Sequence, residues 1–389
     1  MGMTMLLSND DELIALSGPI QGVVSRGLEG VVDAFAANLA DGLEIGAAFA
    51  VSQEGRCVVD IWGGFADGEG ERPWSPDTLC PVFSGTKGLV ALCLAILIDE
   101  GRLELNRGVR DYWPEFGKPG VLVRDVVSHT SRLPGITQPI SVHDFLNQAR
   151  MAEVIAAEQP SDDPRAAQCY HPFTFGWICA ELIQRIDGRP LGLFFQEEVA
   201  TPLGLELWIG LPAHLEHRVA VLSLASSWTQ SYFLQPRFYS GDPLQRAIWA
   251  NPKVLTADSF IWNDPRTHAA GVPGGGAIGT ARAMAKMYDC LPELISREVL
   301  DLASTPLSQG LFGPIGEHRR FGVGFQLAND DQSLGPADAL IGHTGAGGSI
   351  HGRWLDKSVG FSYLMNQLRG DGDVQRADRL LRALHEAIM

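Results

Sequence analysis

The chain has 389 residues, of which 45% are hydrophobic and 20% are charged, and 46 acidic against 30 basic side chains give a formal net charge of −16. This composition is typical of a soluble globular protein whose core needs no disulfides, and it excludes intrinsic disorder. An acidic chain repels phosphate backbones and anionic lipid headgroups, so we expect no nucleic-acid partner and no membrane partner.

The N-terminus and the cysteines indicate a cytoplasmic protein. Asp10, Asp11 and Glu12 stand where a secretory signal would carry basic residues, and the segment has no continuous apolar run. The longest strongly apolar run, Leu89 to Ile98, is too short to cross a bilayer. The six cysteines form no CxxC pair, and we interpret them as small buried side chains in a reducing compartment.

The first hundred residues predict a helix, a hairpin and a buried helix. Hydrophobic spacing predicts an amphipathic helix over Gly27 to Asn38. Two short apolar runs, Gly46 to Ser52 and Cys57 to Gly63, predict a β-hairpin. A loop rich in Gly, Glu and Pro follows over Asp67 to Pro76. The stretch Ser84 to Glu100 is almost wholly apolar and is followed by a glycine, so we expect a buried helix there.

The rest of the chain changes from helical patterns to strand patterns. Residues 111–264 predict helical segments between Pro/Gly loops, such as Val142 to Glu158 and Phe175 to Ile186. Further elements are expected at Thr280 to Cys290 (helix), Leu340 to Thr344, Ser349 to Trp354 and Gly360 to Asn366 (strands), and Val374 to Ile388 (helix). We therefore predict an α+β fold. Residues 1–100 and 270–389 form an antiparallel sheet with flanking helices, residues 101–269 form a mainly helical region, and the site lies in the cleft between them.

Motifs for cofactor chemistry are absent or out of context. No HExxH, paired CxxC or Walker A spacing occurs, so the sequence predicts no metal and no nucleotide cofactor. Gly274 to Gly279 satisfies GxGxxG, but no buried strand precedes it, and we interpret it as a loop. No serine has glycine at both −2 and +2, which excludes the nucleophile elbow of α/β-hydrolases.

One motif for nucleophilic catalysis remains, the SxxK at Ser84 to Lys87. In the first turn of a helix these two side chains lie on one face, so the Lys87 amine can reach the Ser84 hydroxyl. Burial would lower the pKa of Lys87 and make it a proton acceptor, and the helix N-terminus favours negative charge beside Ser84. A serine N-cap followed by a solvated lysine would give the same four-residue pattern without any catalytic role. The nucleophile is favoured because Lys87 opens an otherwise apolar helix, where an unused charge is costly.

Five segments around this motif carry a resemblance to a known family. They are Trp74-Ser75-Pro76-Asp77-Thr78, Val127-Ser128-His129-Thr130-Ser131-Arg132-Leu133-Pro134, Tyr170-His171-Pro172-Phe173-Thr174-Phe175-Gly176, Gly279-Thr280-Ala281-Arg282 and Gly342-His343-Thr344-Gly345-Ala346-Gly347-Gly348. With the SxxK, they resemble the serine β-lactamase and penicillin-binding-protein superfamily, and more narrowly its family VIII carboxylesterases. The resemblance runs from Trp74 to Gly348 and implies a β-lactamase/transpeptidase-like fold.

The resemblance also implies roles for the matching residues. Ser84 would be the acylated nucleophile and Lys87 its proton partner. Tyr170 matches the tyrosine of the YxN motif, which exchanges protons with the nucleophile and the leaving group. Which of Lys87 and Tyr170 is the general base stays open, because coupled groups titrate as a pair. The backbone N–H groups of Ser84 and Ala346 would form the oxyanion hole, and the substrate-binding strand motif, usually KTG, corresponds to His343, Thr344 and Gly345.

The implied activity is that of a serine hydrolase that cleaves small carboxylic esters with short to medium acyl chains through an acyl-enzyme, without a cofactor. Two departures favour esters over β-lactams, since Pro172 replaces the Asn of YxN and His343 replaces the cation of KTG. The alternatives are a β-lactamase, a D-amino-acid peptidase or amidase, and a catalytically silent binding protein of the same fold. The oligomeric state stays open.

Some neighbouring residues carry weaker expectations. We expect His129 to brace its loop rather than to take part in chemistry. Arg132 stands where the family usually has Gly, so a positive φ there would distort the loop. An acyl pocket could be walled by aromatic residues of an irregular stretch, namely Trp228, Tyr232, Phe233 and Phe238.

Overall fold

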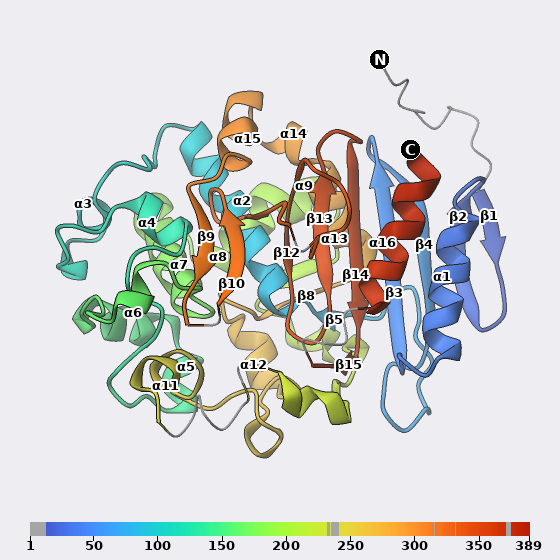
Figure 1. The fold of residues 1–389 in the computed structure, drawn as a ribbon, viewed down its shortest axis with the longest axis horizontal. Coiled ribbons are helices and arrows are strands. Elements are labelled where there is room, and N and C mark those ends of the chain that lie inside the picture. The colour runs from blue at the N-terminus through green and yellow to red at the C-terminus, as the bar shows by residue number, and fades with distance from the viewer. Residues whose placement is uncertain (1–12, 232–233, 235–240, 315, 331, 371–374) are drawn as a thin grey trace.

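A ten-stranded antiparallel sheet forms the centre of the fold (Figure 1). The computed structural model describes residues 13–231, 234, 241–314, 316–330, 332–370 and 375–389. The strands of this sheet are β1 (Leu13–Leu16), β2 (Ile20–Ser25), β3 (Gly46–Gln53), β4 (Arg56–Gly64), β9 (Ser308–Phe312), β10 (Glu317–Phe321), β11 (Gln326–Leu327), β12 (Leu340–Thr344), β13 (Ile350–Trp354) and β14 (Val359–Met365). Their order is β1-β2-β4-β3-β14-β13-β12-β11-β10-β9, so β3 from the start of the chain pairs with β14 from its end.

The predicted hairpin is confirmed as β3 and β4. Its turn residues Glu54 and Gly55 have φ angles of 51° and 76°, the left-handed conformation that a two-residue hairpin turn requires. Both β3 and β14 are buried along their whole length. Strands covered on both faces have continuous apolar sequences rather than alternating ones, which is why these two segments were recognisable.

The strands that sequence patterns did not predict lie toward the edges of the sheet. They are β1, β2, β9, β10 and β11. Along β9, for example, Gln309 and Leu311 face solvent while Phe312 is buried, and β10 is mostly polar. An edge strand needs only backbone pairing on one side, so its side chains carry a weak apolar signal.

Short strands and short helices make up most of the remaining chain. The strands are β5 (Cys80–Pro81), β6 (Leu207–Ile209), β7 (Ser223–Leu224), β8 (Ala277–Gly279) and β15 (Gln367–Leu368). The short helices are α3 (Val109–Tyr112), α4 (Val123–Val127), α5 (Val142–Phe145), α6 (Gln148–Ala157), α7 (Thr174–Asp187), α8 (Leu191–Phe195), α9 (Thr201–Leu203), α11 (Pro243–Trp249), α12 (Pro265–Ala270), α14 (Leu291–Leu294) and α15 (Arg297–Ala303). The single helix expected over Val142 to Glu158 is wrong, because the Asn147 side chain caps a new helix by accepting from the N–H of Arg150.

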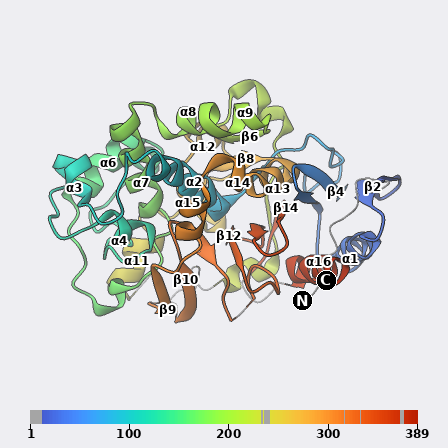
Figure 2. The ribbon, with the colours of Figure 1, turned by 90° about the horizontal axis from the view of Figure 1, so that it is seen from above.

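Helices cover both faces of the sheet (Figures 1 and 2). α1 (Glu29–Ala40) and α16 (Gln375–Ile388) pack against each other on one face, and α13 (Ala281–Asp289) packs on β3 and β14 from the other. The buried stripe of α16 consists of Leu380, Leu381, Leu384 and Ile388, the spacing of an amphipathic helix. The predicted terminal helices and the α+β class are confirmed.

The apolar helix expected near Ser84 is confirmed as α2 (Thr86–Asp99). It is buried from Thr86 to Leu97 and packs between β12 and the helices α7, α8 and α15. It ends before Gly101, whose φ of 69° suits a glycine that terminates a helix. In the part of the chain that the structure describes, no helix is long and apolar enough to cross a membrane.

Cysteine burial follows the prediction at five of the six positions. Cys80, Cys93, Cys169, Cys179 and Cys290 are buried, and all six cysteines are free thiols. Cys57 is exposed, contrary to the expectation. It lies at the start of β4, where the strand still faces solvent.

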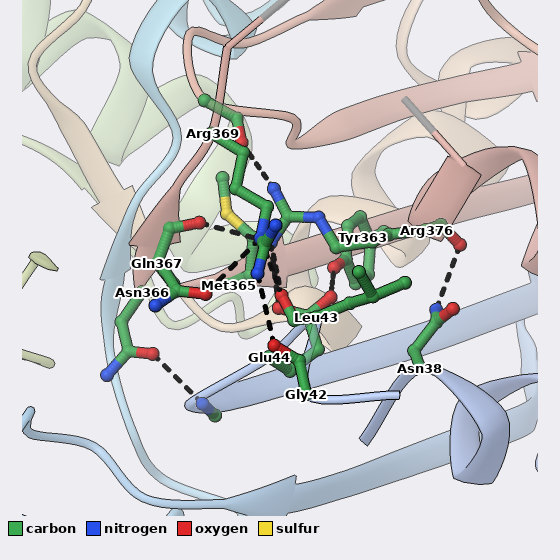
Figure 3. A network of polar contacts seen from close by, with 12 residues as sticks. Asn38, Gly42, Leu43, Glu44, Tyr363, Met365, Asn366, Gln367, Arg369 and Arg376 are labelled. Carbon is green, nitrogen blue, oxygen red and sulfur yellow. Dashed lines mark hydrogen bonds and ion pairs between the residues drawn. The ribbon is translucent and has the colours of Figure 1, made fainter. Parts of the chain in front are cut away.

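A buried ion pair fastens the C-terminal helix to the segment before β3 (Figure 3). The side chains of Arg376 in α16 and Glu44 before β3 are each 1% exposed, with 2.8 Å between Nη1 and Oε2. Arg376 Nη2 donates to the carbonyl of Gly347 at 2.6 Å, and Glu44 also accepts from the Tyr363 hydroxyl. Because both charges are withdrawn from water, loss of one partner would leave the other unpaired, at a cost of about 3–5 kcal/mol. The same arginine thus links α16 both to the segment before β3 and to Gly347 in the loop after β12.

Candidate active site

Ser84 lies in a strained turn at the start of the buried helix. The turn is the 3-10 segment η1 (Phe83–Gly85), so Ser84 precedes α2 instead of occupying its first turn. Phe83 has a φ of 48°, a left-handed conformation that is uncommon for a bulky residue. The Thr86 hydroxyl donates to the Phe83 carbonyl at 2.6 Å and accepts from the Ala277 N–H at 2.9 Å, which ties the turn to β8. Ser84 itself is half-buried, whereas its neighbours are buried.

Lys87 places its amine against the Ser84 hydroxyl. Nζ lies 3.3 Å from Ser84 Oγ, which confirms the contact expected from the SxxK spacing. It also donates to the carbonyls of Pro172 and Gly274, both at 2.7 Å. The side chain is fully buried, so desolvation holds the pKa of Lys87 well below its ordinary value of 10.5.

A glycine at position 274 lets the backbone carbonyl of the loop before β8 reach Lys87. A Cβ on Gly274 would lie 2.7 Å from the Pro172 carbonyl oxygen and 2.9 Å from the Phe173 Cα, so no larger residue fits. Residues 274–276 lead into the short strand β8, where the polypeptide pairs with β5 and β6. The GxGxxG match is thus part of a loop packed against the N-terminus of α7, as its context indicated.

Tyr170 brings a phenol to the same hydroxyl from the segment before α7. Its ring lies 5.0 Å from Lys87 Nζ and is stacked on Phe321 at 6.1 Å. Burial raises the pKa of Tyr170 above its ordinary value of 10, while the nearby Ser84 side chain and the charge of Arg319 act in the opposite direction. The hydroxyl makes no hydrogen bond of normal geometry with the described residues. Packing of its ring therefore contributes to holding the phenol in place.

His343 lies at the end of β12 as a neutral, buried side chain. Its Nδ1 lies 2.7 Å from the Thr344 carbonyl oxygen, which makes Nδ1 the protonated nitrogen. Burial and the neighbouring Lys87 lower the pKa of His343 well below its ordinary value of 6.5. His343 therefore supplies no positive charge at neutral pH, as expected from the replacement of the KTG lysine by histidine.

The glycine of this motif, Gly345, allows the end of β12 to approach the Ser84 turn. A Cβ on Gly345 would lie 2.6 Å from the Val82 carbonyl oxygen, so only glycine fits at this distance. The Gly345 N–H donates to the Ser349 carbonyl at 2.8 Å and closes the loop that carries Ala346. No acceptor among the described residues bonds to the Ala346 N–H. That group is left available at the cavity wall.

Ser84, Tyr170 and His343 line one cavity of about 110 Å³, which also includes Thr344, Gly345 and Ala346. Its opposite wall is apolar and consists of Phe83, Phe173, Trp249, Leu255 and Trp262. The rings of Phe83 and Trp262 are 5.2 Å apart, and Phe173 stacks on Trp262 at 6.4 Å. A second cavity of about 330 Å³ adjoins the first and shares Arg319 and residues 344–346 with it.

Five wall residues were missed by the sequence interpretation, namely Phe83, Trp249, Leu255, Trp262 and Arg319. None belongs to a motif, and they are scattered over the η1 turn, α11, two loops and β10. Of the aromatic residues proposed for this wall, Trp228 lies behind it, where its indole N–H donates to the Leu255 carbonyl at 3.1 Å. The other three, Tyr232, Phe233 and Phe238, lie outside the described residues.

Arg319 is the cationic side chain that borders both cavities. It is paired with Glu317 on the same strand, with Nε 3.0 Å from Oε2. Burial is the largest influence on the pKa values of Tyr170 and His343, and the charge of Arg319 is a smaller one that acts to lower both. A positive charge thus comes from β10 rather than from the KTG position.

Arg132 has a positive φ at the position where the family usually has glycine. Its φ is 61°, the left-handed conformation that glycine would adopt more easily. The guanidinium is fastened by two carbonyls, since Nε donates to Ser161 at 2.8 Å and Nη2 to Asp163 at 3.1 Å. The loop therefore keeps a glycine-like conformation, and side-chain bonds help to hold it.

The described residues offer no place for a metal ion. No group of three or more His, Cys, Asp or Glu side chains among them has the arrangement that a metal requires.

Comparisons with known proteins agree with the fold and with the family resemblance. The Beta-lactamase family model matches residues 32–386. The esterase/beta-lactamase LipL of Mycobacterium tuberculosis (strain ATCC 25618 / H37Rv) is 31% identical over 356 residues, which cover 86% of this chain and 80% of LipL. A solved family VIII carboxylesterase is 35% identical with a TM-score of 0.85, covering 95% of this chain and 99% of that one. A penicillin-binding protein homolog from Caulobacter crescentus is 32% identical with a TM-score of 0.84, covering 95% and 100%. With a family match over most of its length and relatives above 30% identity, this chain belongs to the beta-lactamase family.

Proposed function

We propose that the protein is a carboxylesterase that cleaves small ester substrates through an acyl-enzyme on Ser84. The observation that carries the proposal is the buried amine of Lys87, 3.3 Å from the Ser84 hydroxyl, with the Tyr170 phenol beside them. The named esterases among the similar proteins support this chemistry. We place the reaction in the cleft between the sheet region, residues 1–100 and 270–389, and the mainly helical region, 101–269.

In the proposed acylation, Ser84 Oγ attacks the ester carbonyl carbon and its proton passes to Lys87 Nζ. The backbone N–H groups of Ser84 and Ala346 stabilise the oxyanion of the tetrahedral intermediate. As the carbon–oxygen bond to the alcohol breaks, the Tyr170 hydroxyl gives its proton to the leaving oxygen and takes one from the Lys87 ammonium. The alcohol departs, and the acyl group stays on Ser84.

Deacylation reverses these proton transfers with water as the nucleophile. A water molecule loses a proton to the Lys87–Tyr170 pair and attacks the acyl carbon. Ser84 Oγ leaves and regains a proton, and the carboxylic acid is released. No metal or organic cofactor takes part in the proposed steps.

Lys87 is the better candidate for the general base. Desolvation lowers its pKa and raises that of Tyr170, so burial favours a neutral amine and a neutral phenol together. A neutral amine accepts a proton, and a neutral phenol donates one. We therefore propose Lys87, rather than Tyr170, as the general base.

Esters with short to medium acyl chains suit this cavity better than β-lactams. The wall formed by Phe83, Phe173 and Trp262 is apolar, and the cavity is small. His343 is neutral, so the position that would attract a β-lactam carboxylate carries no charge. His343, Thr344 and Gly345 would then hold the ester by shape and through backbone groups.

The first prediction compares substrate classes on the purified protein. We expect p-nitrophenyl acetate and butyrate to be hydrolysed with a kcat/KM at least about 100-fold above that for the palmitate ester, because a long chain exceeds the cavity. Nitrocefin and a D-amino-acid amide should be turned over far more slowly than butyrate. Faster nitrocefin hydrolysis would support a β-lactamase, and no reaction with any activated ester would support a silent binding protein.

The second prediction concerns pH. Protonated Lys87 cannot accept the Ser84 proton, so kcat/KM should rise with pH through the Lys87 pKa, at a midpoint well below 10.5. The raised pKa of Tyr170 keeps the phenol protonated, so no falling limb is expected below about pH 10. Initial rates with p-nitrophenyl butyrate between about pH 5 and about pH 10, corrected for spontaneous hydrolysis, test this. A bell-shaped profile with a falling limb near neutrality would contradict the assignment.

A further inference from the structure

One buried histidine contacts the polypeptide on both sides of Tyr170. The His129 carbonyl accepts from the N–H of Cys169 at 3.2 Å, and its Nδ1 accepts from the N–H of His171 at 3.2 Å. Its ring packs against the Tyr170 ring with 4.9 Å between centroids. Backbone and side chain of His129 thus hold the two residues that flank the phenol, and the ring holds the phenol itself.

The conformation of His129 is unusual for its residue type. Its φ is 62°, in the left-handed region, and its side chain is fully buried. A left-handed residue other than glycine persists only where its surroundings over-determine it, and such residues gather at functional sites. Here the surroundings include Phe321, whose ring lies 4.3 Å from that of His129 and also stacks on Tyr170.

This support matters because the position of the phenol depends on the residues that pack around it. The Tyr170 hydroxyl has no partner of normal geometry among the described residues, so its direction depends on how its backbone and ring are held. A second link reinforces the same segment, since His171 Nε2 lies 2.9 Å from the Ser131 hydroxyl. The loop 129–131 is therefore the support of residues 169–171.

We propose that His129 is a positioning residue that acts through Tyr170, by holding residues 169–171 so that the phenol points at Ser84. The inference rests on the proposed function and deepens it, because it assigns a task in proton transfer to a residue that touches neither substrate nor nucleophile. A displaced phenol would still allow substrate to bind but would transfer protons poorly.

Two substitutions of His129 distinguish the contribution of its Nδ1 acceptor from that of its ring. H129N keeps an oxygen where Nδ1 stands and tolerates a positive φ, so it should retain kcat within about fivefold. H129F keeps a ring but has no acceptor and resists the left-handed conformation. We expect its kcat to fall about 100-fold, because small displacements of a catalytic group have effects of that size. KM should stay within about twofold.

A double-mutant cycle with Tyr170→Phe provides the decisive measurement. If His129 acts only through the phenol, H129F should change kcat by less than about twofold once the hydroxyl is absent. All rates are divided by the concentration of sites titrated with a fluorophosphonate, so that an unfolded fraction does not count as lost activity. Circular dichroism and thermal unfolding of each variant accompany the rates.

The outcomes distinguish the inference from the function on which it rests. A kcat of H129F that equals wild type per titrated site, or that falls equally in both backgrounds, overturns the role of His129. An equal loss in H129N and H129F also overturns it, since the acceptor would then not matter. Full activity of the Tyr170→Phe variant alone would instead overturn the proposed catalytic role of Tyr170.

Discussion

Replacing Ser84 with alanine is expected to lower kcat/KM for p-nitrophenyl butyrate by about 10⁵-fold or more, to the background rate. The substitution removes the oxygen that forms the acyl-enzyme, and among the described residues it is the Ser84 hydroxyl that lies within hydrogen-bond distance of the Lys87 amine. The amine, the oxyanion N–H groups and the apolar wall would all remain, so substrate binding should survive. Fluorophosphonate labelling, followed by intact mass, should likewise disappear.

A serine far from the cavity provides the control. Ser304 follows α15, where its hydroxyl donates to the Leu300 carbonyl at 2.9 Å, and Ser304→Ala should retain both hydrolysis and labelling. Labelling that persists in Ser84→Ala would place the nucleophile elsewhere and refute the assignment.

Two substitutions of Lys87 are expected to lower kcat/KM by about 10³- to 10⁴-fold. Lys87→Met removes the amine, and Lys87→Arg keeps a positive charge and hydrogen-bond donors but cannot lose its proton near neutral pH. If Lys87 is the general base, both variants should be equally impaired. Such a result would show that the lone pair of the amine, rather than a positive charge, activates Ser84.

The measurement is the pH profile of kcat/KM for the two variants beside wild type. The rising limb assigned to Lys87 should vanish in both, leaving residual rates that follow hydroxide concentration alone. Activity of Lys87→Arg within about tenfold of wild type would contradict a base at this position and favour electrostatic stabilisation by a cation. Thermal unfolding is recorded in parallel, because the carbonyls of Pro172 and Gly274 lose their donor in Lys87→Met.

The parts of the fold that depend on residues close together in the sequence were predictable. The apolar run of α2 and the amphipathic stripe of α16 follow from helical spacing, and the β3–β4 hairpin follows from two apolar runs around a short turn. The Ser84–Lys87 contact was predictable for the same reason, since the two residues are three apart. The edge strands β1 and β9 were missed because backbone pairing, and not side-chain pattern, stabilises them.

The sequence by itself determined the candidate nucleophile, the amine beside it and the family motifs, because each of these is a short pattern of residue types. Only the tertiary structure decided what surrounds them. The carbonyls that hold Lys87 come from residues 172 and 274, the charge that reaches Tyr170 comes from Arg319, and the support of Tyr170 comes from His129. These groups are far apart along the chain and meet because the sheet joins both ends of it around the helical segments. Burial, and with it the lowered pKa of Lys87, is a property of that assembled environment and not of any local motif.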